Sequence, residues 1–151
     1  MLEEIDRRLL RHWLAQPEMS SADLSVILGI PTARVSRRIE KLREAGILQG
    51  VHGVIDWRAL GYAVEVSLRV QLDKTVPGVF DAFLAAARDV PEVTEIQTFL
   101  GRVDVRLTVI AKDMSHWQRL YRDRVLTLPH IAEIEALMQV ATVKTDQALP
   151  L

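Results

Sequence analysis

Two spacings of apolar residues divide the chain into a helical part and a mixed part. In the first third, apolar residues recur every three or four positions, as they do on the buried face of a helix. From Tyr62 onward, stretches that alternate apolar and polar residues lie between further helical stretches. The change of period predicts a helical head over residues 1–56, a linker over residues 57–62 and an α+β domain over residues 63–151.

The head is predicted to contain three short helices. The inner faces of the first two are formed by Leu2, Ile5, Leu9 and Trp13 and by Leu24, Ile27 and Leu28. The first helix ends near Pro17, because proline is disfavoured inside a helix. Ser20 and Asp23 resemble a capping box at the start of the second helix. Gly29 suits a sharp turn before the third helix, since glycine tolerates positive φ.

The third helix has one apolar face and one basic face. At about 100° per residue, its apolar side chains are Val35, Ile39 and Leu42, and its basic side chains are Arg34, Arg37, Arg38 and Lys41. Pro31 ends the preceding turn, Thr32 can cap the helix and Gly46 suits its C-terminus. A helix-turn-helix presents its second helix to the DNA major groove with this layout. A basic face that is merely solvated remains the alternative.

The residues predicted to face DNA follow from this helix. They are Thr32, Ala33, Arg34, Ser36, Arg37, Arg38 and Lys41. Residues near the start of the helix are expected to reach base edges, whereas Arg38 and Lys41 are expected to meet phosphates. After the helix, residues 47–55 are β-like and interrupted by two glycines, so we expect a strand leaving the head, with the character of a wing.

The second domain is predicted to have the order βαββαβ. The expected strands are 64–72, 93–100, 103–109 and 131–143, and the expected helices are 76–90 and 114–128. A bulge is expected near Glu135 in the last strand. This order is the ferredoxin-like plan, an antiparallel sheet with two helices on one face. The other face carries aliphatic residues such as Leu100, Ile110 and Leu137, so we expect a second copy of the chain to cover it.

Composition narrows the classes of function. The 151 residues include no cysteine, so disulfides and thiolate metal sites are excluded, and a reducing cytoplasm is expected. No apolar run approaches the length of a membrane span, and the charged start of the chain is unlike a signal peptide. The net charge is −1. Contact with nucleic acid should therefore be confined to the locally basic stretch 34–43.

The order and spacing of several short motifs resemble the Lrp/AsnC family of transcription regulators. These motifs are Ile5–Leu10, Val35–Leu42, Ala45–Ile47, Asp56–Gly61, Gly101–Asp104, Val143–Thr145 and Ala148–Pro150. The resemblance covers nearly the whole chain. It implies a winged helix-turn-helix head, a ferredoxin-like regulatory domain, and a dimer that associates further into tetramers or octamers.

The resemblance also implies a small effector, commonly an amino acid, bound between dimers near a Gly-x-x-Asp loop. The corresponding residues here are Thr98, Gly101, Arg102, Val103 and Asp104. Here the Asp carboxylate could accept from the ligand's ammonium group, and the backbone N–H groups exposed by glycine could donate to the ligand's carboxylate. The alternative is a plain hairpin turn with a solvated Asp104. No cofactor, metal site or catalytic residue is expected.

Two features depart from the family pattern. Pro31 stands where the family often has a capping serine, and the loop Pro17–Met19 lacks the arginine that the family often places there. Two alternatives to a DNA-binding regulator remain. One is an enzyme like the siroheme decarboxylases that share this fold, although the four histidines are scattered along the chain. The other is an effector-binding or assembly protein that does not bind DNA.

Overall fold

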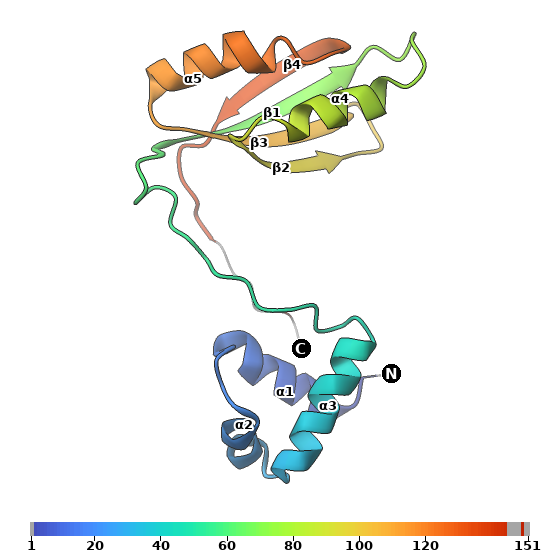
Figure 1. The fold of residues 1–151 in the computed structure, drawn as a ribbon, viewed down its shortest axis with the longest axis vertical. Coiled ribbons are helices and arrows are strands. Elements are labelled where there is room, and N and C mark those ends of the chain that lie inside the picture. Colours follow the sequence, from blue (N-terminus) through green and yellow to red (C-terminus); the bar gives the residue numbers. More distant parts are fainter. Residues whose placement is uncertain (1, 145–148, 150–151) are drawn as a thin grey trace. The chain divides into compact units, whose positions relative to one another are not determined.

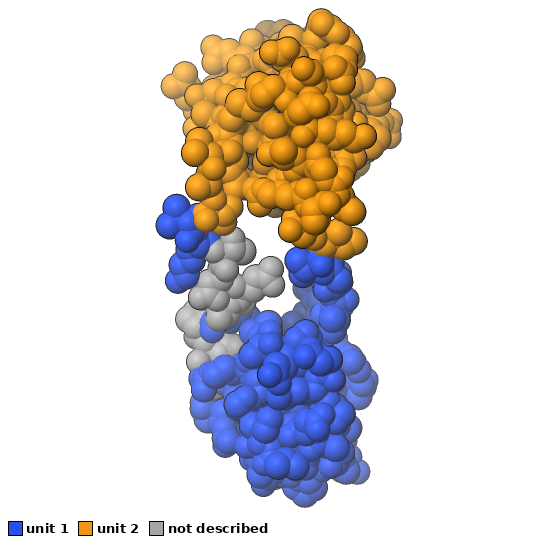
Figure 2. All heavy atoms as spheres, turned by 90° about the vertical axis from the view of Figure 1, so that its left-hand side faces the viewer, with its two compact units in different colours: residues 1–54, 143–151 blue, residues 55–142 orange. Residues whose placement is uncertain are grey.

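The structure, a computed structural model, describes residues 2–144 and 149, and they fall into two compact units. The first is made mainly of residues 2–54, together with Val143, Lys144 and Leu149, and the second is 55–142 (Figure 2). Thr145, Ala148 and Pro150, which belong to the resemblance above, lie outside the described residues.

The first unit contains three helices: α1 (Glu4–Ala15), α2 (Ser21–Leu28) and α3 (Thr32–Glu44) (Figure 1). Its core is formed by Leu9, Leu10, Trp13, Leu24, Leu28, Val35, Ile39, Leu42 and Leu48. These residues include most of the apolar positions that the helical period placed on the inner faces. The three predicted helices are therefore confirmed. The assignment of Ile27 to the inner face was wrong, because this residue is 38% exposed and is not part of the core.

Local side-chain bonds define the turn between α2 and α3. At the start of α2, Ser20 Oγ accepts from the backbone N–H of Asp23, and the Asp23 carboxylate accepts from the N–H of Ser20. This is the predicted capping box. At the other end Gly29 adopts a φ of 67°, a left-handed conformation that favours glycine. Ser25 Oγ donates to the carbonyl of Ile30 at 2.6 Å and closes the turn.

The expected strand over residues 47–55 is absent from the structure. These residues, all described, form no ladder and have no regular secondary structure. An extended segment becomes a strand only when a neighbouring strand takes its backbone hydrogen bonds, and none does so here. Residues 57–61, within the expected linker, form a turn in which the Asp56 carboxylate accepts from the backbone N–H groups of Arg58 and Ala59.

The second unit has the predicted order of elements. They are β1 (Val64–Leu72), α4 (Val79–Arg88), β2 (Val93–Thr98), β3 (Val105–Ala111), α5 (Met114–Leu120), the π-helical turn η1 (Tyr121–Val125) and β4 (Ile131–Met138). The antiparallel sheet has the order β2-β3-β1-β4, and both helices lie on one of its faces (Figure 1). The α+β, ferredoxin-like prediction is confirmed.

The last strand ends at Met138 and not at residue 143, and two further details of the second unit were predicted wrongly. The second helix changes at Tyr121 into a π turn, in which the N–H of Leu126 donates to the carbonyl of Tyr121. The bulge in β4 lies at Ala132, because Leu72 pairs with Ile131 while Gln71 pairs with Glu133. Neither feature changes the apolar period enough to be visible in the sequence.

The alternation along the strands separates a core face from an open face. On the core face, Val66, Leu68, Val70 and Leu72 of β1 are buried with their counterparts from β3 beneath α4 and α5. The open face is mostly polar, which corrects the expectation of an aliphatic face. Its members are Glu65, Ser67, Arg69, Gln71, Glu95, Gln97, Arg106, Thr108, Ile110, Glu133, Glu135 and Leu137. Leu100 lies beyond β2 in an exposed loop.

Candidate nucleic-acid and effector interfaces

The outer face of α3 brings most of the predicted DNA-facing residues together. Thr32, Ala33, Arg34, Ser36, Arg37 and Lys41 are all exposed, while the apolar residues of the same helix are buried. Thr32 is the first helical residue and not the cap, because Pro31 holds the capping position without a side-chain hydrogen bond. Ser36 Oγ donates to the carbonyl of Thr32 at 3.2 Å, which leaves its oxygen free to accept from outside the helix.

Arg38 is not part of this exposed face, and its expected contact with phosphate is not supported. Its side chain is only 11% exposed and donates to the carboxylates of Glu3 and Asp6 on the α1 side. Arg38 Nη1 lies 2.7 Å from Asp6 Oδ1. Because both carboxylates come from the protein itself, the guanidinium cannot also meet a phosphate without breaking this cluster. Arg38 therefore joins α3 to the start of α1.

Hydrogen bonds stabilise the charged forms of the groups in this cluster. Burial disfavours the charged form of Asp6, but hydrogen bonds from Arg38 and from the backbone N–H of Glu3 outweigh it and lower the pKa of Asp6. The hydrogen bond from Arg38 also lowers the pKa of Glu3, and the two carboxylates raise the pKa of Arg38. All three groups are therefore charged at neutral pH, and the cluster is structural.

The predicted effector residues lie in or beside the loop between β2 and β3 and differ in burial. Thr98 ends β2 and is exposed, as are Gly101 and Arg102, while Val103 is half-buried. Gly101 has a φ of 154°, which side chains rarely adopt. Asp104, by contrast, is 3% exposed. It is therefore neither an open acceptor for a ligand, as predicted, nor a solvated residue, as in the alternative.

Asp104 anchors the loop to the end of β1. Its carboxylate accepts from the backbone N–H of Leu72 at 2.9 Å and lies 2.7 Å from Lys74 Nζ. Its own N–H donates to the carbonyl of Val70. Burial raises the pKa of Asp104, but the hydrogen bonds from Lys74 and Leu72 outweigh this and lower it. The carboxylate is thus ionised and already satisfied within the chain.

A hollow of about 320 Å³ lies beside the loop, on the open face of the sheet. Its lining residues are Arg69, Gln71, Arg102, Val103, Glu133, Ile134 and Glu135. Arg102 and Val103 are therefore the only predicted effector residues that line it, and Thr98, Gly101 and Asp104 do not. The strand residues were not predicted as a site, although the period of two already placed Arg69 and Gln71 on the outward face of β1.

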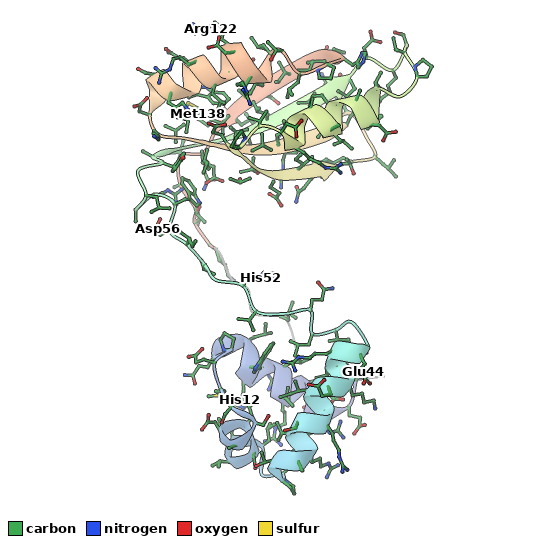
Figure 3. The ribbon with its side chains drawn as sticks, viewed as in Figure 1. His12, Glu44, His52, Asp56, Arg122 and Met138 are labelled. Carbon is green, nitrogen blue, oxygen red and sulfur yellow. The ribbon has the colours of Figure 1, made fainter. Side chains whose placement is uncertain are left out.

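The histidine and acidic side chains of the described residues form no cluster that could hold a metal ion. His12 lies on α1 and His52 on the segment after α3, well separated in the chain (Figure 3). His116 Nδ1 accepts from the backbone N–H of Lys112, which is a local structural bond. None of the described helices is long and apolar enough to cross a membrane.

A helix-turn-helix with an exposed basic helix, followed by a ferredoxin-like domain, is typical of DNA-binding regulators that carry the DNA-binding domain and the regulatory domain on the same polypeptide. Family models agree. Residues 2–49 match the winged helix-turn-helix DNA-binding model, and residues 65–149 match the Lrp/AsnC ligand binding domain. The chain belongs to the Lrp/AsnC family of transcriptional regulators.

Similar proteins cover the chain almost completely. It is 26% identical to the transcriptional regulator AzlB of Bacillus subtilis, over 100% of this chain and 96% of that protein. It is also 26% identical to the leucine-responsive regulatory protein of Salmonella typhimurium, over 98% of this chain and 90% of that protein. Among solved structures, a regulator from Neisseria meningitidis in complex with L-Met has a TM-score of 0.90 at 20% identity, over 99% and 97% of the two chains. For Escherichia coli AsnC the TM-score is 0.86 at 21% identity, over 97% of both.

Proposed function

We propose that this transcriptional regulator binds duplex DNA through the outer face of α3 and that its binding responds to a small amino acid held by the second unit. The observation that carries the DNA contact is the burial pattern of α3: one side forms the core of the head, and Arg34, Arg37 and Lys41 project from the other. Cations on an exposed helix face can meet phosphates, and the residues at its start can reach base edges.

Amino-acid control is supported by the ligand binding domain and by the named relatives. One structural relative is a complex with L-Met, and several sequence relatives are leucine-responsive regulatory proteins. A ligand changes DNA binding only if it favours one assembly or conformation over another. We propose that the effector acts on the association of copies, and so on the spacing of the heads along DNA.

Self-association is proposed to use the open face of the sheet. Ile110 and Leu137 lie at one end of this face, beside Glu65 and Ser67 of β1. The rest of the face carries side chains of both charges, which suits a symmetric contact in which each acid meets a base of the other copy. Sedimentation of the chain and of the variant Ile110→Glu tests this contact, and a monomeric wild-type chain would contradict it.

The DNA-binding face is tested by Arg37→Ala in gel-shift titrations against genomic fragments bound by the wild-type chain. We expect a loss of affinity of about fivefold or more, because one exposed charge-assisted contact is removed. Arg119→Ala is the matched control, since it removes the same charge from the second unit. Equal affinity of the Arg37 variant and the wild type would show that another face meets DNA.

A further inference from the structure

The outward face of α3 carries an acid among its cations. At about 100° per residue, Arg37 and Glu40 lie about 60° apart on the side of the helix opposite Val35, which is buried. Both are exposed. A carboxylate on a face that meets a polyanion weakens the binding of every DNA sequence, unless a base donates a hydrogen bond to it. The place of Glu40 on this face therefore points to a contact with a base.

The carboxylate of Glu40 is held in position and keeps a free acceptor. Its Oε1 accepts from Arg43 Nη1 at 2.7 Å, within the same helix. Among the described residues, nothing donates a hydrogen bond to its Oε2. Because the ion pair already restricts the side chain, Glu40 loses less conformational freedom when Oε2 accepts from a bound molecule.

Arg37 provides a free donor beside this acceptor. It lies three residues before Glu40, yet Glu40 pairs with Arg43. Among the described residues, the guanidinium of Arg37 has no hydrogen-bond or ion-pair partner, whereas that of Arg38 is bound to carboxylates of the α1 region. The fork of N–H groups on Arg37 is thus available to two acceptors outside the protein.

The edges of two bases match these groups. We propose that Arg37 reads a guanine and that Glu40 reads a cytosine in a neighbouring base pair. The inference rests on the proposed binding of duplex DNA through α3 and adds which bases this face selects. In the major groove, guanine presents the acceptors O6 and N7 to a guanidinium, and cytosine presents the N4 amino group to a carboxylate. Adenine also has an amino donor, but its N7 acceptor lies beside it and would repel the carboxylate.

The spacing along α3 limits the distance between the two bases. Three residues span about 4.5 Å along a helix. Successive bases of one strand are about 3.4 Å apart along the duplex. The guanine and the cytosine should therefore lie in adjacent base pairs or be separated by one base pair.

The test is the selection of bound duplexes from a library with a randomised centre, by the full chain and by its variants, followed by sequencing. For the wild type we expect enrichment of a guanine and a cytosine at the spacing given above. Glu40→Gln should replace the preference for cytosine by one for adenine, because an amide meets N6 and N7 of adenine together. Arg37→Ala should lose the preference for guanine and keep that for cytosine.

Gel-shift titrations at constant salt measure the size of the change. The wild type should bind its most enriched duplex about fivefold or more tightly than the same duplex with adenine in place of that cytosine. Glu40→Gln should reverse this order. It should also bind DNA of mixed sequence more tightly than the wild type does, because a charge that the phosphates repel is removed. A variant that merely disturbed the fold would bind all duplexes more weakly.

The matched control is Glu44→Gln, the same substitution one turn further along α3, where the acid is also exposed. This variant should select the same bases as the wild type and change the affinity for all duplexes by one common factor. A switch from cytosine to adenine in this control as well would overturn the assignment of the cytosine to Glu40.

The outcomes separate the two proposals. A wild-type selection that enriches neither base, or a Glu40→Gln variant that selects the same sequences as the wild type, would overturn the base assignment and leave DNA binding through α3 in place. Failure of the wild type to retain any duplex would overturn the proposed DNA binding and this inference with it.

Discussion

The side chain of Arg38 shows how one contact changes the role of a residue. From its position on α3, it belongs with the cations that face DNA, yet its guanidinium lies between two carboxylates of the α1 region. Among the buried side-chain atoms of the described residues, only Arg38 Nε lacks a hydrogen-bond partner. The residue therefore contributes to the fold of the head and not to its DNA-binding face.

Replacing Arg38 by methionine should destabilise the chain by about 3 kcal/mol, because Asp6 would remain charged and buried without its partner. Urea unfolding at pH 7 measures the effect. Arg43→Met is the matched control, since Arg43 pairs with Glu40 at the surface of the same helix and its loss should cost about 0.5 kcal/mol or less. A similar midpoint for the two variants would contradict the structural role of Arg38.

The buried carboxylates predict how stability depends on pH. The pKa values of Asp6 and Asp104 are lowered from the ordinary value of 3.8 by their hydrogen bonds. Their contribution is therefore fully present above that pH and is lost as the pH falls through the lower, folded-state pKa. We expect these two groups to leave the urea midpoint nearly constant between about pH 7 and 5. Below about pH 4 the midpoint should decrease as they become protonated.

The variant Asp104→Asn should weaken this acid dependence, because the amide keeps an acceptor for the N–H of Leu72 but has no charge to lose. At pH 7 it should also be less stable than the wild type, since Lys74 no longer faces an anion. Urea midpoints of the variant and the wild type between pH 7 and pH 2 test both points. Parallel curves over that range would show that ionisation of Asp104 does not stabilise the fold.

At the scale of elements, the turn between α2 and α3 fixes the relation of the two helices of the DNA-binding motif. Gly29 ends α2 with a φ of 67°, and Ser25 binds the carbonyl of Ile30 one residue further on. The Cβ of alanine would meet no atom within 4 Å at Gly29, so any cost comes from the backbone alone.

Gly29→Ala should therefore lower the free energy of unfolding by about 1 kcal/mol, the usual cost of a left-handed residue with a Cβ. The control is Gly53→Ala, because Gly53 has no positive φ and no close neighbour. Thermal unfolding followed by circular dichroism compares the two. Equal melting temperatures would show that the turn relaxes without cost.

At the scale of the whole molecule, the position of Arg38 changes the expected dependence of DNA binding on salt. Of the four cations predicted to face DNA, three are exposed in each head: Arg34, Arg37 and Lys41. Two heads on one duplex should therefore neutralise about six phosphates and release the counterions bound to them. The slope of log K against log salt should then be roughly −5, compared with roughly −7 for four cations per head.

Gel-shift titrations at salt concentrations between about 50 and 200 mM measure this slope. Arg38→Lys should leave the slope unchanged, whereas Lys41→Gln should reduce it by about 2 in a dimer. A reduction of the slope in the Arg38 variant that matches that of the Lys41 variant would show that Arg38 meets phosphate in the complex.

The sequence by itself determined the class of the fold. The helical period of Leu9, Trp13 and Leu24 and the period of two in Val66, Leu68 and Val70 are local properties, and they are enough to order the elements and to assign their buried faces. Hydrophobic burial follows that periodicity directly, because all the side chains on one face of an element point toward the same neighbouring layer. The helix-turn-helix and the βαββαβ order were therefore predictable.

Only the tertiary structure decided which polar side chains are free to bind. Arg38 and Asp104 are each satisfied by partners about thirty residues away in the chain, so no local pattern distinguishes them from Arg37 and Arg102. The same holds for the strand expected over residues 47–55, which lacks a neighbour to pair with. Ion pairs and strand pairing depend on what lies opposite in space, whereas the apolar period depends on the chain alone.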